Sequence, residues 1–359
     1  MTDPGIPQDA VHDRDDFARR QAEMTSQWYE NVKRREGDVE AYIKRRHDAY
    51  LGRWAEAARF IPKGARVLDI GGGNLFPKLV EFFVRRRFDY HYLDIDEGAA
   101  TGSRHLAQQH GLDPNKFATG FNDKLDFPNA TFDSVFSSHC IEHSIDLDRT
   151  FSELNRVLKL DGMLLMAVPF GWEENPEHPY FFTPDLWVAL VEDAGFEVRI
   201  ATIGKEYPES GYDYFIAARK VREGRRWQRL SPDEYQKDSY SFLRFDSEHI
   251  TYSGNHKPTF EGEAEHLLGM NWAVQIDLPQ PAAQILPVFK RHPWSGIVSL
   301  DRNNGSQVLF EDLYSWITYV QPVGMGYRFE NSSSATIRPI GRNAVAQDSQ
   351  GVLCGVLYR

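Results

Sequence analysis

The sequence predicts an α/β fold in which a mostly parallel sheet carries helices on both faces and is followed by an antiparallel β domain. Between about residues 64 and 219, short apolar runs alternate with helix-like segments, a pattern typical of doubly wound sheets. The segment VLDIGGGN at 67–74 places three glycines directly after the first apolar run. Beyond about residue 245, short β-like runs are separated by Pro, Gly and Asn, which indicates a sandwich or jelly roll.

Composition limits the classes of function. The chain has 359 residues, of which 41% are hydrophobic, so it can bury the cores of two domains. Its net charge of −11 argues against nucleic acid as a partner, because that affinity comes largely from Lys and Arg on phosphates. Two cysteines, Cys140 and Cys354, are too few for a disulfide framework. With no apolar run long enough to span a membrane and no signal-like start, the prediction is a cytoplasmic protein.

The first domain element is an N-terminal helical brace or lid over residues 1–60. Residues 1–12 are expected to be a frayed tail, and two charged helical segments follow, separated near Gly37 and Asp38. In the second segment apolar residues recur at helical spacing, and Asp38 is its expected N-cap. One face of this helix should therefore pack on the domain that follows.

The central domain is expected over residues 61–220. Its last two strands are joined by a loop containing Tyr207, Pro208 and Gly211, which is too short for a crossover helix, so this pair should be antiparallel. The seven strands are expected near 66–70, 89–95, 116–121, 132–137, 162–168, 196–203 and 212–219.

The remainder is expected to be a linker over residues 221–245 and a β-rich accessory domain over 246–359. Several aromatic residues punctuate this β domain. We expect most of them in the core or an interface, and a sugar-binding surface with a rim at 292–294 and 301–305 is the alternative. The aromatic residues in question are Trp272, Trp294, Tyr314, Trp316 and Tyr327.

The glycine turn and an acid on the second strand predict a nucleotide-like ligand. Glycines at 71–73 can adopt left-handed backbone conformations and let a ligand approach the main chain. Asp94 ends the second predicted strand, where a carboxylate can accept the hydroxyl hydrogens of a ribose, although it could instead cap the next helix. Phe76 stands where nicotinamide dehydrogenases need a third glycine, and no GxxxxGK[ST] phosphate loop is present.

Together, four segments over roughly residues 60–219 resemble the class I S-adenosylmethionine-dependent methyltransferases. They are VLDIGGGN, YLDID, FDSVFSSHCIEHSIDLDRTFSELNRVLKLDGMLLMAVP and HPYFFTPDLWVALVEDAGFEV. The resemblance implies a Rossmann-like seven-stranded sheet and S-adenosylmethionine as cofactor. Two departures exist: Leu160-Asp161-Gly162 replaces the usual Pro-Gly-Gly turn, and the third-strand acid is hard to place among Asn122, Asp123 and Asp126.

The same resemblance implies which residues bind the cofactor. Those residues follow the first four strands: Asp69, Gly71 and Gly73 would border the methionine part, Asp94 would hold the ribose, Ile95 would lie against the adenine, Asn122 or Asp123 would lie near the adenine amino group, and Ser138 and His139 would line the site.

Four residues are candidates for removing a proton from the acceptor. The methyl donor is already electrophilic, so the main tasks are alignment and exclusion of water, and a base is needed only for a hydroxyl acceptor. The candidates are His178, His139, His143 and Glu142. His178 is favoured because it follows the fifth strand, where substrate loops converge, whereas the pair Glu142-His143 could simply begin a helix and orient its loop.

Residues 139–143 also match the H-x-x-E-H signature of an inverted zinc protease. That signature belongs on a long helix, and here it follows a predicted strand, so a metalloprotease is not favoured. We predict that the site has no metal. An ion held by His139, Glu142 and His143 within a methyltransferase is the alternative.

The sequence thus predicts a cytoplasmic methyltransferase whose acceptor is a hydroxyl of a sugar, glycan or related small molecule, a form of carbohydrate modification. Methylation of a polyketide or phenolic natural product is one alternative, and a binding or scaffold protein that retains the cofactor fold without turnover is another. The expected partner is the small-molecule or glycan acceptor. The β domain and the N-terminal helices are the segments through which a second copy of the chain would bind.

Overall fold

The computed structural model describes residues 8–35, 38–172, 178–204, 212–224, 232–260, 262–302, 307–325 and 331–359. The chain divides into two compact units, and the division near residue 232 falls inside the predicted linker. Residues 170–172 and 179–183 belong to the second unit. The expected hairpin loop with Tyr207, Pro208 and Gly211, most of the predicted rim at 301–305, and Tyr327 lie outside the described residues.

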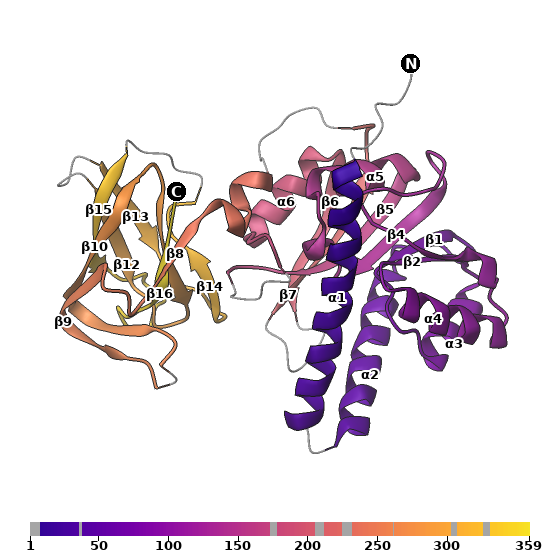
Figure 1. The fold of residues 1–359 in the computed structure, drawn as a ribbon, viewed down its shortest axis with the longest axis horizontal. Helices are drawn as coiled ribbons and strands as arrows, with labels where there is room; N and C mark the ends of the chain where they lie inside the picture. The colour runs from indigo at the N-terminus through magenta and orange to yellow at the C-terminus, as the bar shows by residue number, and fades with distance from the viewer. Residues whose placement is uncertain are drawn as a thin grey trace. The chain divides into compact units, whose positions relative to one another are not determined.

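Two long helices open the first unit, α1 (Gln8–Arg35) and α2 (Val39–Ala57), shown in indigo and violet in Figure 1. The prediction of a tail over residues 1–12 is wrong from Gln8 onward, because α1 begins there. Asp38 caps α2 as expected, accepting a hydrogen bond from the Ala41 amide at 2.9 Å. Trp54 of α2 is fully buried, with its ring 4.0 Å from that of Phe136, so α2 is anchored on the sheet core.

A seven-stranded sheet forms the body of this unit, in the order β3-β2-β1-β4-β5-β7-β6. β7 pairs antiparallel with both β5 and β6, and the other pairs are parallel, which confirms the predicted sheet and its antiparallel last pair. The strands are β1 (Arg66–Ile70), β2 (Asp89–Asp94), β3 (Phe117–Thr119), β4 (Phe132–Ser138), β5 (Leu158–Pro169), β6 (Phe196–Gly204) and β7 (Asp213–Lys220).

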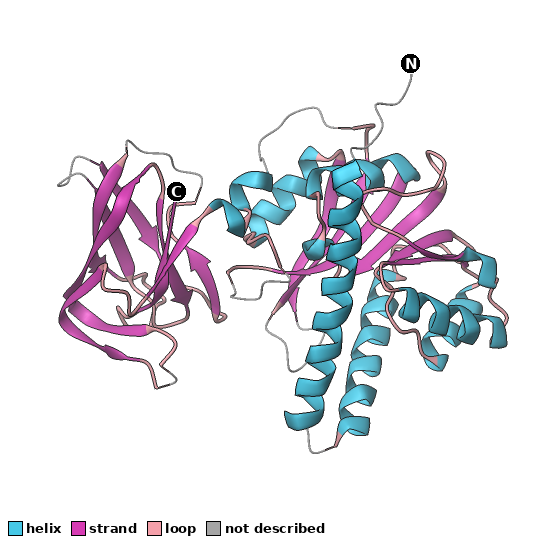
Figure 2. Ribbon diagram, in the orientation of Figure 1, coloured by secondary structure: helices cyan, strands magenta, loops and turns pink. Residues whose placement is uncertain are grey.

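Helices connect these strands, as Figure 2 shows. They are α3 (Pro77–Arg86), α4 (Glu97–Gln109), the short turn η1 (Pro114–Lys116), the short turn η2 (Ile141–His143), α5 (Leu147–Val157) and α6 (Pro184–Asp193). The chain order reverses between β1 and β4, where one strand leads to β2 and the other to β5. Open sheets of this kind bind ligands in the crevice at that point.

The segment Leu160-Asp161-Gly162 lies inside β5, which begins earlier than the sequence suggests. Phe132 pairs with Leu158 and Ser134 with Met163, so the intervening residues of β5 bulge out of the ladder. Asp161 has a positive φ of 64° at this bulge. A Cβ on Gly162 would lie 2.8 Å from the Lys159 carbonyl oxygen, so the bulge requires glycine there.

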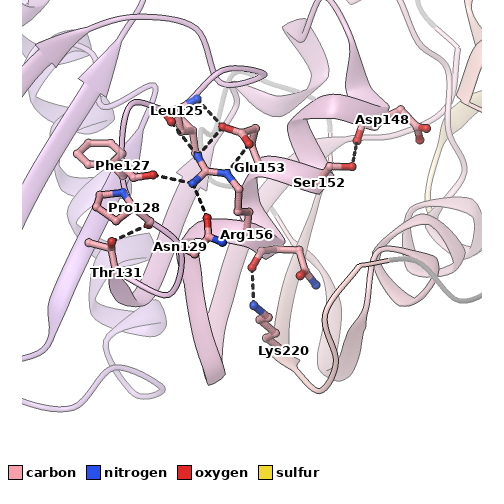
Figure 3. Close-up of polar contacts among 11 residues, drawn as sticks. Leu125, Phe127, Pro128, Asn129, Thr131, Asp148, Ser152, Glu153, Arg156 and Lys220 are labelled. Atoms are coloured by element: carbon pink, nitrogen blue, oxygen red, sulfur yellow. Dashed lines mark hydrogen bonds and ion pairs between the residues drawn. The ribbon is translucent and has the colours of Figure 1, made fainter. Parts of the chain in front are cut away.

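The loop between β3 and β4 is fastened to α5 by Arg156 (Figure 3). Its guanidinium donates to the carbonyl oxygens of Leu125 and Phe127 at 2.8 and 2.6 Å, and it pairs with Glu153 at 2.6 Å. Glu153 in turn accepts a hydrogen bond from the Leu125 amide at 2.7 Å. Because the start of this loop borders the cavity described below, these contacts hold one wall of that cavity in place.

The described residues of the second unit form nine antiparallel strands in one branched sheet, which confirms the antiparallel β domain predicted for the C-terminal region. The strand β8 lies inside the segment that the sequence assigns to the linker. Its strands are β8 (Ser241–Arg244), β9 (Ile250–Pro258), β10 (Glu265–Ala282), β11 (Ile285–Arg291), β12 (Ile297–Arg302), β13 (Gln307–Asp312), β14 (Tyr319–Pro322), β15 (Ser332–Gly341) and β16 (Gly351–Tyr358).

Seven strands of this sheet follow the order β13-β12-β15-β10-β16-β11-β14. The other two lie off this row, with β8 paired to β16 and β9 paired to β10. Two short turns, η3 (Pro232–Tyr235) and η4 (Lys237–Ser239), precede these strands. Trp272 is buried in the core, whereas Trp294 and Trp316 are 46% and 65% exposed, so the aromatic residues divide between core and surface. No helix among the described residues of either unit is long and apolar enough to cross a membrane.

Candidate functional site

A cavity of about 250 Å³ opens at the carboxyl ends of the first four strands of the first unit. Its wall combines the turn after β1, the end of β2, the loops after β3 and β4, and one face of α1. The lining residues are Phe17, Gln21, Ala22, Ile70, Gly71, Gly73, Asn74, Leu93, Asp94, Ile95, Asp96, Ala99, Gly120, Phe121, Asn122, His139, Cys140, His143 and Ile145.

The glycine turn needs glycine for two physical reasons. Gly71 has φ of +73°, and a Cβ there would lie 2.3 Å from the Cβ of Cys140 in the loop after β4. Gly72 packs against the Tyr92 ring, which a Cβ would approach to 2.6 Å. Gly73 has φ of +56° with open space beside it. The turn therefore fits tightly beneath the loop after β4 while Gly73 leaves room in the cavity.

Asp94 lies on the cavity wall and holds the turn from the side. Its carboxylate accepts hydrogen bonds from the amides of Gly73 and Asp96 at 2.8 and 2.9 Å. Burial raises the pKa of Asp94, although these amides oppose the rise. Asp96 caps α4, accepting from the Gly98 amide at 2.7 Å, so the capping role that the sequence left open for Asp94 belongs to Asp96.

Asp69 lies beneath the turn and is not among the lining residues. Its side chain is fully buried and accepts a hydrogen bond from the Tyr90 hydroxyl at 2.6 Å. Burial raises the pKa of Asp69 to about 8, and the nearby Asp94 carboxylate adds to this rise while the Tyr90 hydrogen bond opposes it. Tyr92 donates to the Gly73 carbonyl oxygen at 2.8 Å, so both tyrosines of β2 support the turn.

The loop after β3 meets α1 across the cavity. Asn122 lines the wall, and its amide donates to the Ser144 hydroxyl at 2.9 Å. Asp123 forms a two-pronged ion pair with Arg14 of α1, with distances of 2.8 and 2.6 Å. The Arg14 guanidinium also lies 5.0 Å from the centre of the Phe121 ring. Since Asp123 is 1% exposed, this pair fastens α1 over the cavity.

The loop after β4 brings an extended set of ionisable groups to the cavity. His139 has a positive φ of 49°, and its amide donates to the Ala167 carbonyl oxygen at 2.9 Å. Its Nδ1 lies 3.5 Å from Glu142 Oε1 and its Nε2 lies 3.8 Å from Asp213 Oδ2. Asp213 is itself paired with Arg53 of α2 at 2.5 Å. His139 therefore stands between two buried carboxylates.

Glu142, His143 and His178 continue this set, and of these three only His143 lines the cavity wall. His143 Nε2 lies 3.9 Å from Glu142 Oε1, and the His143 and His178 rings are 4.6 Å apart in an edge-to-face arrangement. Burial raises the pKa of Glu142, but the three histidines outweigh burial and hold it below its usual value. A chain of groups able to accept or hold a proton thus runs from the cavity into the interior.

Of the predicted cofactor positions, the cavity wall contains Gly71, Gly73, Asp94, Ile95, Asn122 and His139. Asp69, Asp123 and Ser138 are buried next to the wall and do not line it. Of the predicted bases, His139 and His143 line the wall, while Glu142 and His178 are not among the lining residues.

Sequence reasoning missed four contributors. Phe17 and Gln21 come from α1, Cys140 packs on the turn, and Asp213 begins β7. The helical period of residues 8–35 signals a helix, but nothing local signals that its face covers a cavity.

Comparison with known proteins gives one family match and distant relatives. Residues 68–166 match the family model described as a methyltransferase domain. The 2-methyl-6-phytyl-1,4-hydroquinone methyltransferase 1, chloroplastic, of Oryza sativa subsp. japonica is 27% identical over 166 residues, covering 42% of this chain and 47% of that protein. The sarcosine/dimethylglycine N-methyltransferase of Aphanothece halophytica is 29% identical over 118 residues, covering 32% and 42%.

The chain therefore spans less than half the length of these curated relatives. Among solved structures, a SAM-dependent methyltransferase from Aquifex aeolicus is 22% identical with a TM-score of 0.40, covering 47% of this chain and 89% of that one.

Proposed function

We propose that this chain, whose residues 68–166 match the model of a methyltransferase domain, uses S-adenosylmethionine to methylate a hydroxyl group of a small-molecule acceptor. The observation that carries the proposal is the placement of His139. Its imidazole lines the cavity at the strand ends, where we place the cofactor, and stands between the carboxylates of Glu142 and Asp213. An imidazole held in this way can receive the proton that a hydroxyl must lose.

The cavity offers suitable contacts for each part of the cofactor. We assign the backbone of Gly71 and Gly73 to the methionine part, where the space beside Gly73 admits the ligand. Asp94 keeps carboxylate lone pairs for the ribose hydroxyls in addition to its two amide bonds, and Ile95 offers an apolar surface to the adenine.

S-adenosylmethionine supplies an electrophilic methyl group on a sulfonium sulfur. The acceptor oxygen forms a bond to the methyl carbon as the carbon–sulfur bond breaks, with its electron pair going to sulfur, and the hydroxyl proton passes to His139. Glu142 and Asp213 orient this imidazole and stabilise its charged form. The Arg14–Asp123 ion pair holds α1 over the cavity and so excludes water during transfer.

Among hydroxyl acceptors we propose a sugar or glycan first, with a phenolic acceptor as the second class. The support is separate from the cavity: Trp294 and Trp316 of the second unit present exposed indole surfaces on which sugar rings could stack. The relatives named above act on a hydroquinone and on sarcosine and dimethylglycine, so the family accommodates acceptors of different chemistry. We propose the cytoplasm as the location, since two cysteines in the whole sequence are too few for the disulfide framework of a secreted protein.

A labelled-methyl transfer screen over sugars, sugar nucleotides, glycans, phenols and amines tests the proposal. His139→Ala should retain binding of S-adenosylhomocysteine and lose about 10²- to 10⁴-fold in turnover, the usual contribution of a general base. His105→Ala, which changes an exposed histidine of α4, serves as the matched control. Transfer to amines alone would exclude a hydroxyl acceptor. Cofactor binding with no transfer to any class would favour the non-catalytic scaffold.

A further inference from the structure

Three side chains, of which His143 alone lines the cavity, form a compact set of potential metal ligands. One donor atom each from Glu142, His143 and His178 lies within 4.8 Å of the other two, and no other such set occurs among the residues that the structure describes. Glu142 and His143 are adjacent on η2, whereas His178 reaches them from the segment after β5. The fold therefore assembles the set from two strand ends.

The carboxylate of Glu142 is the second observation that points to a ligand. Its side chain is 2% exposed, yet neither oxygen accepts a hydrogen bond within the described part of the chain. Two imidazole nitrogens lie near Oε1 of this carboxylate, His139 Nδ1 at 3.5 Å and His143 Nε2 at 3.9 Å. Buried carboxylates are costly unless they are hydrogen-bonded or bind a cation. A cation between Glu142 and the imidazoles of His143 and His178 would bind one of these oxygens and compensate the buried negative charge.

The surroundings of the set resemble the outer support of a metal site. Glu142 faces His139, His139 faces Asp213, and Asp213 pairs with Arg53. Such outer contacts fix the orientation of ligating side chains and commonly accompany metal ligands. The sequence alone grouped His139 with Glu142 and His143. In the structure His139 lies between Glu142 and Asp213 and is not part of the set, whereas His178 is.

We propose that Glu142, His143 and His178 bind a divalent transition-metal ion of the Zn²⁺ type. Two imidazole nitrogens and one carboxylate oxygen suit such ions, whereas Mg²⁺ and Ca²⁺ take mostly oxygen ligands. Tetrahedral Zn²⁺ with bonds of about 2.0 to 2.2 Å needs donors about 3.4 Å apart. The donor atoms of these three residues lie within 4.8 Å of one another, so the distances between them must shorten by roughly an ångström. Rotation of the side chains provides this movement.

The role of this ion rests on the proposed function, although its binding does not. Three protein ligands leave a fourth position open. His143 belongs both to the ligand set and to the cavity wall, so the open position would receive an acceptor hydroxyl oxygen. Coordination would lower the pKa of that hydroxyl and so ease the loss of its proton.

Metal binding is tested on the full chain purified without chelator, by elemental analysis and by titration of the stripped protein with Zn²⁺. We expect about one ion per chain. With Co²⁺ in its place, we expect the visible absorption of a low-symmetry site. Glu142→Gln and His178→Ala should each weaken Zn²⁺ binding at least about 100-fold. Loss of a residue that only supports a ligand lowers metal affinity about 10- to 100-fold, and loss of the ligand itself should lower it more. His105→Ala should bind Zn²⁺ like the native chain.

Binding of S-adenosylhomocysteine and thermal unfolding confirm that each variant is folded. Absence of saturable Zn²⁺ binding by the native chain, or unchanged binding by folded Glu142→Gln, would overturn the metal site. Methyl transfer by stripped protein at the native rate would overturn its role in the reaction and leave the proposed function standing. Tight Zn²⁺ binding without methyl transfer to any acceptor would instead count against the proposed function alone.

Discussion

Replacing Gly71 by alanine should destabilise the protein far more than the same change at Gly73. Both residues have a positive φ, which costs about 1–2 kcal/mol for a residue with a Cβ. At Gly71 the new Cβ would also lie 2.3 Å from the Cβ of Cys140, well inside the normal contact distance of about 3.5–4.0 Å. Relieving that overlap moves the loop after β4 and costs about 1–3 kcal/mol more.

The expected loss in free energy of unfolding is therefore about 2–5 kcal/mol for Gly71→Ala and about 1–2 kcal/mol for Gly73→Ala. Urea unfolding followed by circular dichroism measures both. Removing the opposing Cβ tests the cause directly: in the double variant Gly71→Ala with Cys140→Gly, the steric part should disappear and the backbone part should remain. A double-mutant cycle then gives a favourable coupling of about 1–3 kcal/mol between the two changes.

Equal destabilisation by the two alanine variants would refute this reasoning, as would a double variant with no rescue. Binding of S-adenosylhomocysteine supplies an independent readout. Gly71→Val adds bulk at the same contact and should abolish binding, because the turn must then separate from the loop after β4. Retained affinity in that variant would mean that the turn does not border the cofactor.

Three further predictions concern other parts of the first unit. Arg14→Ala and Asp123→Asn should each weaken S-adenosylhomocysteine binding in calorimetry, because each removes the ion pair that holds α1 over the cavity. The double variant should show a coupling of about 1–3 kcal/mol between the two changes. Additive effects would mean that the ion pair does not hold α1 in place. Lys220 is fully buried and donates to the carbonyl oxygens of Asn155 and Leu158 at 2.7 and 2.9 Å, so Lys220→Ala should lower the free energy of unfolding by about 2–4 kcal/mol and Lys220→Met by less. Asp69 has a folded pKa of about 8 against an ordinary value of 3.8, so the folded state keeps a proton that the unfolded state has lost, and stability should fall as pH rises between these values. Asp69→Asn should show a smaller decline in its urea midpoint from pH 5 to pH 8, and an identical decline would contradict the assignment.

The strand and turn positions of the first unit were predictable because their signals are local. Alternating apolar runs located the seven strands, and the glycines of the first turn can be identified from their place after β1. The bulge at Asp161 was not predictable, because it depends on how β5 registers against β4. Its sequence suggests a turn between elements, and only pairing with Phe132 and Ser134 shows that the strand continues on both sides.

The candidate site was predictable only where its residues follow strands in the motif. Asp94 and His139 could be placed at strand ends from the sequence. Arg14 and Asp123 are separated by 109 positions, and no spacing rule joins them. Asp213 reaches His139 because β7 inserts beside β5, so its carboxylate arrives from late in the chain. These contacts depend on tertiary packing, which a single sequence does not reveal.

Because the strand order reverses at β1, the residues that we assign to the methyl donor and those that we assign to the acceptor lie on different halves of the sheet. The residues that we assign to the methyl donor follow β1 and β2, while His139, His143 and His178 follow β4 and β5. Apart from Cys140, which packs on the glycine turn, residues on the β4 and β5 side can change and reshape the pocket for a new acceptor while the turn stays as it is. Related proteins with this sheet can therefore change their acceptor while they keep the same methyl donor. The half of the sheet that binds the donor would vary little during evolution, and the half that faces the acceptor would vary more.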